Sequence, residues 1–171
     1  MKKKELLKIF DKNLQYYDRT YRELKAILEF IEFQKNQELI DVGAGIGRLS
    51  VPISFRLNVL ALEPNKNLAD KINEHNIEVI TKKIENFFPS EKFDYALFAW
   101  PGLLNYGEVF KHIRKEILNA NGRLIVIKPI EHSLKQIACA LSPQDFDAGG
   151  QFFEVLSDFF IIEKEKEFKT T

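Results

Sequence analysis

Residues 38–55 read ELIDVGAGIGRLSVPISF, and this stretch decides the fold. Its first five residues form a short, mostly apolar run that is typical of a buried strand. Three glycines and then a helical pattern follow, so the stretch predicts a strand, a tight turn and a helix. The glycines are Gly43, Gly45 and Gly47. Pro52 removes a backbone donor within the expected helix, which begins at Arg48, and we expect a bend or a local irregularity there.

The alternation of strands and helices continues on both sides of this stretch. Helices are expected where apolar residues recur every three or four positions, and strands at short apolar runs. The further expected strands are residues 58–62, 77–81, 93–99 and 123–128, and the further expected helices are residues 14–35, 67–74 and 106–118. Such alternation implies right-handed crossovers, so we predict a doubly wound, mostly parallel, Rossmann-like α/β fold.

Beyond Pro129 the pattern is less regular. It predicts helices at residues 133–141 and 152–158, and a last strand at residues 159–168. No turn signal interrupts the chain after residue 159, so this segment suffices for one strand and the sheet is expected to have six. The alternating charges of residues 163–167 are typical of a protected edge strand.

Length and composition exclude several classes of protein. A chain of 171 residues predicts one domain with a substantial core. The 25 basic and 25 acidic residues balance, which argues against a dedicated nucleic-acid binder. The lone Cys139 excludes a disulfide framework, and the three histidines are too dispersed for a metal site. With no secretory signal and no apolar run that could span a bilayer, we expect a soluble, cytoplasmic protein that does not enter a membrane.

Two carboxylates accompany the glycine turn. Asp41 lies two residues before the first glycine, and Glu63 follows the second expected strand. In a doubly wound sheet Glu63 lies beside the turn, where it can accept hydrogen bonds from both hydroxyls of a ribose. The carboxylate of Asp41 suits a cationic amine better than a pyrophosphate. The alternative interpretation is a tight connection flanked by an ordinary surface acid.

The spacing of the glycines separates two kinds of ligand. A dinucleotide fingerprint has its third glycine three positions after the second, and here Arg48 fills that position. The acid-x-Gly-x-Gly-x-Gly turn, followed by an acid after the second strand, resembles the class I S-adenosylmethionine-dependent methyltransferases. The resemblance covers residues 39–168, and residues 93–98 and 118–127 look like that family's fourth strand and its turn into the fifth.

The resemblance implies S-adenosylmethionine as the cofactor. The glycines would admit its methionine part, Asp41 would hold its amino group and Glu63 its ribose hydroxyls. Ile46 and Ile84 would enclose the adenine, and Tyr17 would reach the methionine carboxylate unless it is a core aromatic. The implied cofactor-binding residues are Asp41, Gly43, Ala44, Gly45, Gly47, Glu63, Pro64, Ile84, Ala99 and Tyr17. Residues 1–36 would form a helical lid, and residues 37–171 the cofactor-binding α/β domain.

The chain departs from the family pattern in two places. Where the family places an acid that binds the adenine amine, this chain has Lys82-Lys83-Ile84-Glu85, so that contact would come from the backbone or from Glu85. The usual seventh, antiparallel strand is also missing. The exposed C-terminal edge would then be open to a second copy of the chain or to a partner protein.

Methyl transfer does not require a particular base motif, because alignment of the reactants supplies much of the catalysis. The catalytic residues are therefore left unassigned. The weak candidates are Trp100, Glu131 and His132, with Asp145 as a further base and with Asn105 and Tyr106 facing the reacting methyl group. Each of these has an alternative structural role, and Trp100 could equally be a core residue under the next helix.

The sequence thus predicts an S-adenosylmethionine-dependent methyltransferase that acts on a small molecule and not on nucleic acid. The alternative is a non-catalytic, methyltransferase-like subunit that works through a partner protein. A nicotinamide-dinucleotide oxidoreductase is disfavoured by the glycine spacing and by Asp41. An RNA or protein acceptor stays open because several basic residues could form a local patch, namely Lys82, Lys83, Lys111, Arg114 and Lys115.

Overall fold

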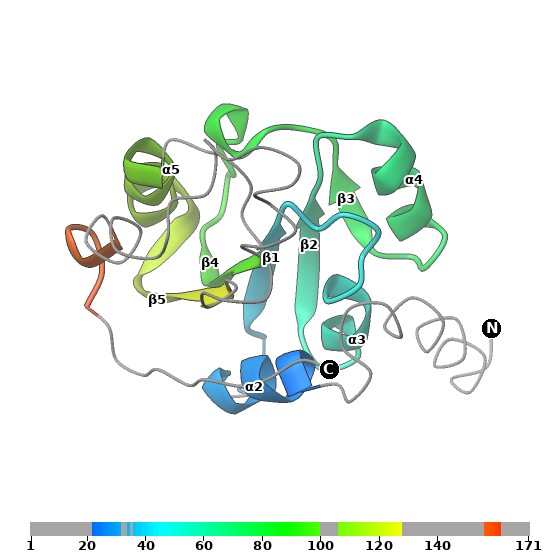
Figure 1. Ribbon diagram of the computed structural model, residues 1–171, viewed down its shortest axis with the longest axis horizontal. Helices are drawn as coiled ribbons and strands as arrows, with labels where there is room; N and C mark the ends of the chain where they lie inside the picture. Colours follow the sequence, from blue (N-terminus) through cyan, green and yellow to red (C-terminus); the bar gives the residue numbers. More distant parts are fainter. Residues whose placement is uncertain (1–21, 32–33, 35, 100–105, 128–155, 162–171) are drawn as a thin grey trace, which may run out of the picture.

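The structure is a computed structural model that describes residues 22–31, 34, 36–99, 106–127 and 156–161. Its centre is a sheet of five parallel strands in the order β3-β2-β1-β4-β5 (Figure 1). The strands are β1 (Glu38–Val42), β2 (Asn58–Leu62), β3 (Glu78–Ile80), β4 (Phe93–Ala99) and β5 (Leu118–Ile127). The predicted doubly wound parallel sheet is confirmed.

Helices cover both faces of the sheet. They are α2 (Arg22–Phe30), α3 (Ser50–Ser54), α4 (Lys66–Asn73), the 3₁₀ turn η1 (Ile84–Asn86), α5 (Tyr106–His112) and the π-helical turn η2 (Ile113–Ile117). On one face α2 and α3 pack against Leu39 and Leu97. On the other face α5 and η2 pack against Ile40 and Phe98. This alternation along β1 follows from the two-residue period of a strand and produces two apolar layers around the sheet.

Most elements lie where the sequence predicts them, but the helices on either side of β1 are shorter than expected. α2 ends at Phe30 instead of residue 35, because the chain already turns towards β1. In that turn Gln34 N–H donates to Gln37 Oε1, and Asn36 takes a left-handed φ of 66°. α3 has only five residues, because residues 43–49 form the turn. Pro52 lies in the first turn of α3. The backbone N–H groups of a first turn have no acceptor within the helix, so proline is tolerated there.

The segment from α5 to β5 differs in two ways from the prediction. The expected continuous helix widens into η2 over its last turn. The Asn121-Gly122 pair does not precede the last described strand but lies inside it, because β5 begins at Leu118. Phe93 of β4 pairs with Leu118 of β5, whereas Tyr95 of β4 pairs with Arg123 of β5. The extra residues of β5 between these two pairs form a bulge. A Cβ on Gly122 would lie 3.0 Å from the Phe93 carbonyl oxygen, so glycine lets the bulge approach β4.

The predicted last strand does not begin at residue 159. Phe159 N–H and Phe160 N–H both donate to the Leu156 carbonyl oxygen, so a helical turn still continues here. Because these donors are used within the turn, Phe159 and Phe160 do not extend a sheet ladder. Residues 162–168 and the helix predicted at residues 133–141 lie outside the described residues, and the prediction of a sixth strand stays untested there.

Candidate functional site at the glycine turn

The glycine turn joins β1 to α3 and is fastened to the end of β2. Gly43, Gly45 and Gly47 have φ angles of 76°, 60° and 81°, which side-chain-bearing residues rarely adopt. Gly43 N–H and Ala44 N–H both donate to the Leu62 carbonyl oxygen, at 2.8 and 3.1 Å. The three glycines therefore let the backbone fold back over the carboxyl end of the neighbouring strand.

The glycines differ in what surrounds them. Among the residues that the structure describes, none has an atom within 4 Å of a Cβ on Gly43 or Gly45. A Cβ on Gly47 would lie 3.0 Å from Val51 Cγ2 and 3.3 Å from Ile72 Cγ1. Gly47 thus allows close packing between the turn and α4, while at Gly43 and Gly45 no described residue packs against the outer side of the turn.

Glu63 holds the middle of the turn. Its Oε2 accepts a hydrogen bond from Gly45 N–H at 2.8 Å, and its Oε1 accepts one from Asn65 N–H at 2.8 Å. The side chain is 6% exposed, so these bonds orient an almost buried carboxylate. Each oxygen keeps one further lone pair with which to accept a hydrogen bond. β1 and β2 pair in parallel, so their carboxyl ends meet and the predicted proximity of Glu63 to the turn is confirmed.

Asp41 lies beneath the turn on the face covered by α2 and α3. It is 2% exposed, and its Oδ2 accepts a hydrogen bond from Ser50 Oγ at 2.5 Å. Burial raises the pKa of Asp41 from 3.8 to about 6, although the hydrogen bond from Ser50 and the charge of Arg48 both lower it. Asp41 is therefore ionised at neutral pH, and the burial of its charge lowers the stability of the folded protein.

The pKa of Asp41 leads to a prediction about stability. The folded state binds the proton of the Asp41 carboxyl group more tightly than the unfolded state does. The free energy of unfolding therefore falls as this group loses its proton, while the pH rises through about 6. The variant Asp41→Asn lacks this titration. Its free energy of unfolding, relative to the wild type, is expected to increase by up to about 3 kcal/mol between about pH 4 and pH 7. Urea denaturation of both proteins at the two pH values measures this difference, and an unchanged difference would contradict the prediction.

Arg48 and Glu23 form a buried ion pair that the sequence did not reveal. Arg48 Nη1 and Nη2 donate to the two carboxylate oxygens of Glu23, at 2.5 and 2.8 Å. The Glu23 side chain is fully buried and that of Arg48 is 13% exposed. One signal was available, because Glu23 precedes the buried Ile27 and Ile31 by four and eight positions and so lies on the apolar face of the helix.

The other predicted site residues fall into three groups. Ala44 and Ile84 are buried in apolar clusters, and Tyr106 packs against the cluster that contains Ile84. Ile46 and Ala99 are half-buried, in the turn and at the end of β4. Pro64 is exposed beside Glu63, and Lys82, Lys83 and Glu85 are exposed after β3. The predicted residues outside the described part of the chain are Tyr17, Trp100, Asn105, Glu131, His132 and Asp145. Among the described residues, no three His, Cys, Asp or Glu side chains come together as metal ligands.

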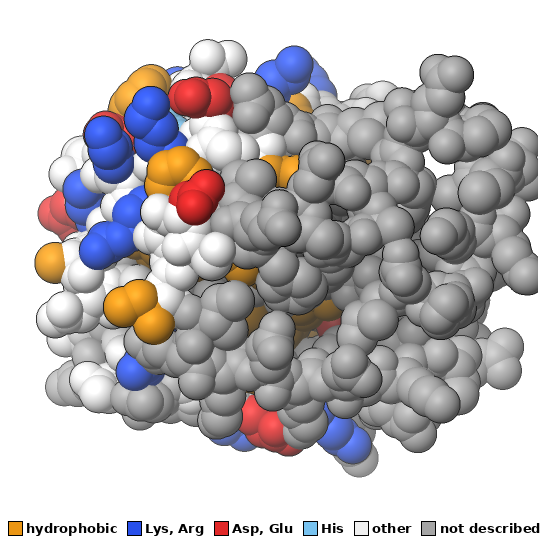
Figure 2. Space-filling view, turned by 60° about the vertical axis from the view of Figure 1, so that its left-hand side comes forward, with side chains coloured by type: hydrophobic (Ala, Val, Ile, Leu, Met, Phe, Trp, Pro, Cys, Tyr) orange, Lys and Arg blue, Asp and Glu red, His pale blue; other side chains and the backbone are white. Residues whose placement is uncertain are grey.

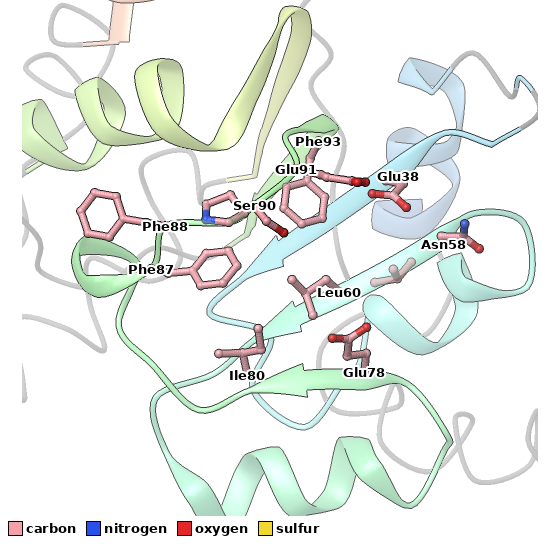
Figure 3. A pocket seen from close by; sticks show the side chains of 12 residues that line it. Glu38, Asn58, Leu60, Glu78, Ile80, Phe87, Phe88, Ser90, Glu91 and Phe93 are labelled. Carbon is pink, nitrogen blue, oxygen red and sulfur yellow. The ribbon is translucent and has the colours of Figure 1, made fainter.

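A second feature is a cavity of about 360 Å³ whose lining does not include the described residues of the glycine turn (Figure 3). Its lining includes Glu38, Asn58 and Glu78, the first residues of β1, β2 and β3. Ligands of open parallel sheets bind at the carboxyl ends of the strands, where the glycine turn lies. The cavity extends along one face of the sheet from these first residues to Leu60 and Ile80, and no described residue of the glycine turn lines it. We therefore assign the candidate site to the turn and not to the cavity.

The chain is similar to two curated ribosomal RNA methyltransferases. The probable ribosomal RNA small subunit methyltransferase A of Methanosphaera stadtmanae is 28% identical over 135 residues, which are 70% of this chain and 49% of the relative. The same-named enzyme of Wigglesworthia glossinidia brevipalpis is 30% identical over 78 residues, which are 39% of this chain and 30% of the relative. The chain thus spans at most about half the length of these curated relatives. No protein-family model matches it.

Solved structures share the fold over most of the chain. The PH0226 protein of Pyrococcus horikoshii superposes with a TM-score of 0.71 at 19% identity, covering 97% of this chain and 94% of that one. A SAM-dependent methyltransferase of Thermotoga maritima, a possible histamine N-methyltransferase, has a TM-score of 0.65 at 21% identity, covering 88% and 78%. The similarity recognised in the sequence is therefore confirmed for the architecture, and the chain has the fold of the class I S-adenosylmethionine-dependent methyltransferases.

Proposed function

We propose that the chain binds S-adenosylmethionine at the glycine turn and transfers its methyl group to a small-molecule acceptor. One observation carries this proposal, namely that the open turn at Gly43 and Gly45 is bonded directly to the carboxylate of Glu63. An exposed backbone next to an oriented acceptor suits a nucleoside with ribose hydroxyls. The similarity to curated methyltransferases supports the same activity.

The residues of the site fit S-adenosylmethionine better than a dinucleotide. Glu63 would accept hydrogen bonds from the ribose hydroxyls through its remaining lone pairs. Asp41 would attract the cationic amino group from beneath the turn, and Gly43 and Gly45 would leave room for the methionine part. A diphosphate at the same place would meet two carboxylates, which would repel it.

The chain's own contribution to the chemistry is alignment. When bound, S-adenosylmethionine supplies a methyl group on a sulfonium that is already a good leaving group. Holding donor and acceptor in line can lower the barrier by roughly 7–11 kcal/mol without a general base. Residues 1–36 as a lid, and Trp100, Glu131 and His132 as the residues near the acceptor, belong to the same proposal.

A ribosomal RNA acceptor is a second candidate, and it is the one that the curated relatives favour. The structure offers a surface for it, because Lys111, Arg114 and Lys115 are exposed on α5 and η2. Figure 2 shows Lys and Arg side chains close together on this face. The balanced net charge of the chain favours the small molecule instead, since RNA binding gains from a basic surplus.

A methyl-transfer assay tests the proposal and separates the acceptors. The purified chain is incubated with methyl-labelled S-adenosylmethionine and either a panel of small amines and hydroxyl compounds or small-subunit ribosomal RNA. We expect label on a member of the small-molecule panel. If only the RNA is labelled, the small-molecule acceptor is wrong and ribosomal RNA is the acceptor. Binding of S-adenosylhomocysteine without transfer to any acceptor would favour a non-catalytic subunit that acts through a partner.

A further inference from the structure

We propose that Glu23 and Arg48 are positioning residues of the S-adenosylmethionine site, which fix the end of the glycine turn by holding it to α2. This inference rests on the proposed function and extends it to a helix that precedes the glycine motif by more than ten residues. Neither side chain needs to touch the cofactor. Their role is to keep the turn in the shape that accepts it.

The geometry of the pair suits this role. Arg48 directly follows Gly47, so its side chain is the first one after the glycines that can hold the turn. Arg48 Nη1 donates to Oε2 of Glu23 and Nη2 donates to Oε1, and such a bidentate pair fixes orientation as well as distance. Because Glu23 is fully buried and Arg48 nearly so, water and salt screen this interaction little.

The turn needs such a fixed point. Its start is bonded to the Leu62 carbonyl and its middle to Glu63, and both of these bonds come from the adjacent end of β2. The Arg48 side chain bonds instead to α2, 25 residues earlier in the sequence. A turn with three glycines has many accessible conformations, and a ligand that had to order it would lose affinity. Fixing the turn in advance avoids that loss.

Stability alone does not account for the pair. α2 already packs on the sheet through Ile27, and Ile31, directly after the helix, packs in the same cluster. Replacing a buried ion pair with apolar side chains of similar volume is often neutral or stabilising. A pair that contributes little net stability but has a strict geometry is expected to affect binding more than folding.

The double variant Glu23→Leu/Arg48→Met separates these two effects. It removes both charges together and keeps the side-chain volume. We expect the dissociation constant for S-adenosylhomocysteine to rise about tenfold or more, while the thermal unfolding midpoint stays the same or increases. A matched double variant at the exposed pair, Glu108→Leu/Lys111→Met, is expected to change neither quantity.

The variant Arg48→Lys gives a second test that needs no ligand. It keeps the charge but loses the bidentate geometry, and we expect the amides of residues 43–49 to exchange their hydrogens about tenfold faster. Unchanged exchange, or an unchanged dissociation constant in a folded double variant, would overturn the inference and leave the proposed function intact. Failure of the wild-type chain to bind S-adenosylhomocysteine would overturn both.

Discussion

Replacing Glu63 with alanine is expected to weaken the binding of S-adenosylhomocysteine about 100-fold or more. The carboxylate would provide two charge-assisted hydrogen bonds to the ribose, each contributing about 1.5–3 kcal/mol. It also accepts the hydrogen bonds that hold Gly45 and Asn65, so its loss releases the middle of the turn. Titration calorimetry of the wild type and Glu63→Ala measures the effect.

The variant Glu78→Ala serves as the control for Glu63→Ala. It removes the same charge from the chain, but Glu78 is exposed and begins β3 at the end away from the glycine turn. We expect the affinity of Glu78→Ala for S-adenosylhomocysteine to stay within about twofold of the wild type, because salt screens the effect of an exposed charge at the far end of the strand. Equal losses in the two variants would mean that net charge governs binding, and would refute the assignment of Glu63.

The variant Arg48→Met is expected to have the largest effect on stability. It leaves the fully buried carboxylate of Glu23 without the guanidinium that donates two hydrogen bonds to it. Removing one partner of a buried ion pair costs about 3–5 kcal/mol, because the remaining charge is poorly solvated. Urea denaturation at neutral pH measures the change in the free energy of unfolding.

The exposed pair of Lys111 and Glu108 provides a comparison within the same chain. Their side chains are 47% and 68% exposed and the charged atoms lie 3.9 Å apart. Lys111→Met is therefore expected to lower the free energy of unfolding by no more than about 0.5 kcal/mol. If Arg48→Met lowers the free energy of unfolding by less than about 1 kcal/mol, the prediction that loss of the buried pair strongly destabilises the protein is wrong.

The sheet could be predicted from sequence because its strands are short apolar runs separated by clear turn signals. β1, β2 and β4 lie at the predicted residues. β5 begins five residues early, because the bulge at Gly122 depends on its close approach to Phe93, a contact between strands that no local pattern encodes. The early end of α2 likewise depends on how Gln34 and Asn36 lead into β1.

The site was predictable where topology alone brings residues together. Parallel pairing of β1 with β2 places Glu63 beside Gly45, and this follows from strand order. The contact between Asp41 and Ser50 and the pair of Glu23 with Arg48 depend instead on how α2 and α3 are rotated over the sheet. The rotation of a helix over a sheet is determined by packing. These two contacts beneath the turn could therefore be found only in the structure.

Among the described residues, no helix has both the length and the apolar character needed to cross a membrane. The curated relatives are ribosomal RNA methyltransferases. The expectation that nucleic acid is not an acceptor is therefore not confirmed.

Calorimetric titration of S-adenosylhomocysteine into the wild-type chain, with Gly45→Glu as the comparison, tests the central claim most directly. The glutamate would need the left-handed φ of 60°, and its side chain would occupy the outer side of the turn, where we propose that the cofactor binds. We predict one binding site per wild-type chain and no measurable binding to Gly45→Glu. An affinity of Gly45→Glu within about twofold of the wild type, or the absence of binding to the wild type, would contradict the account.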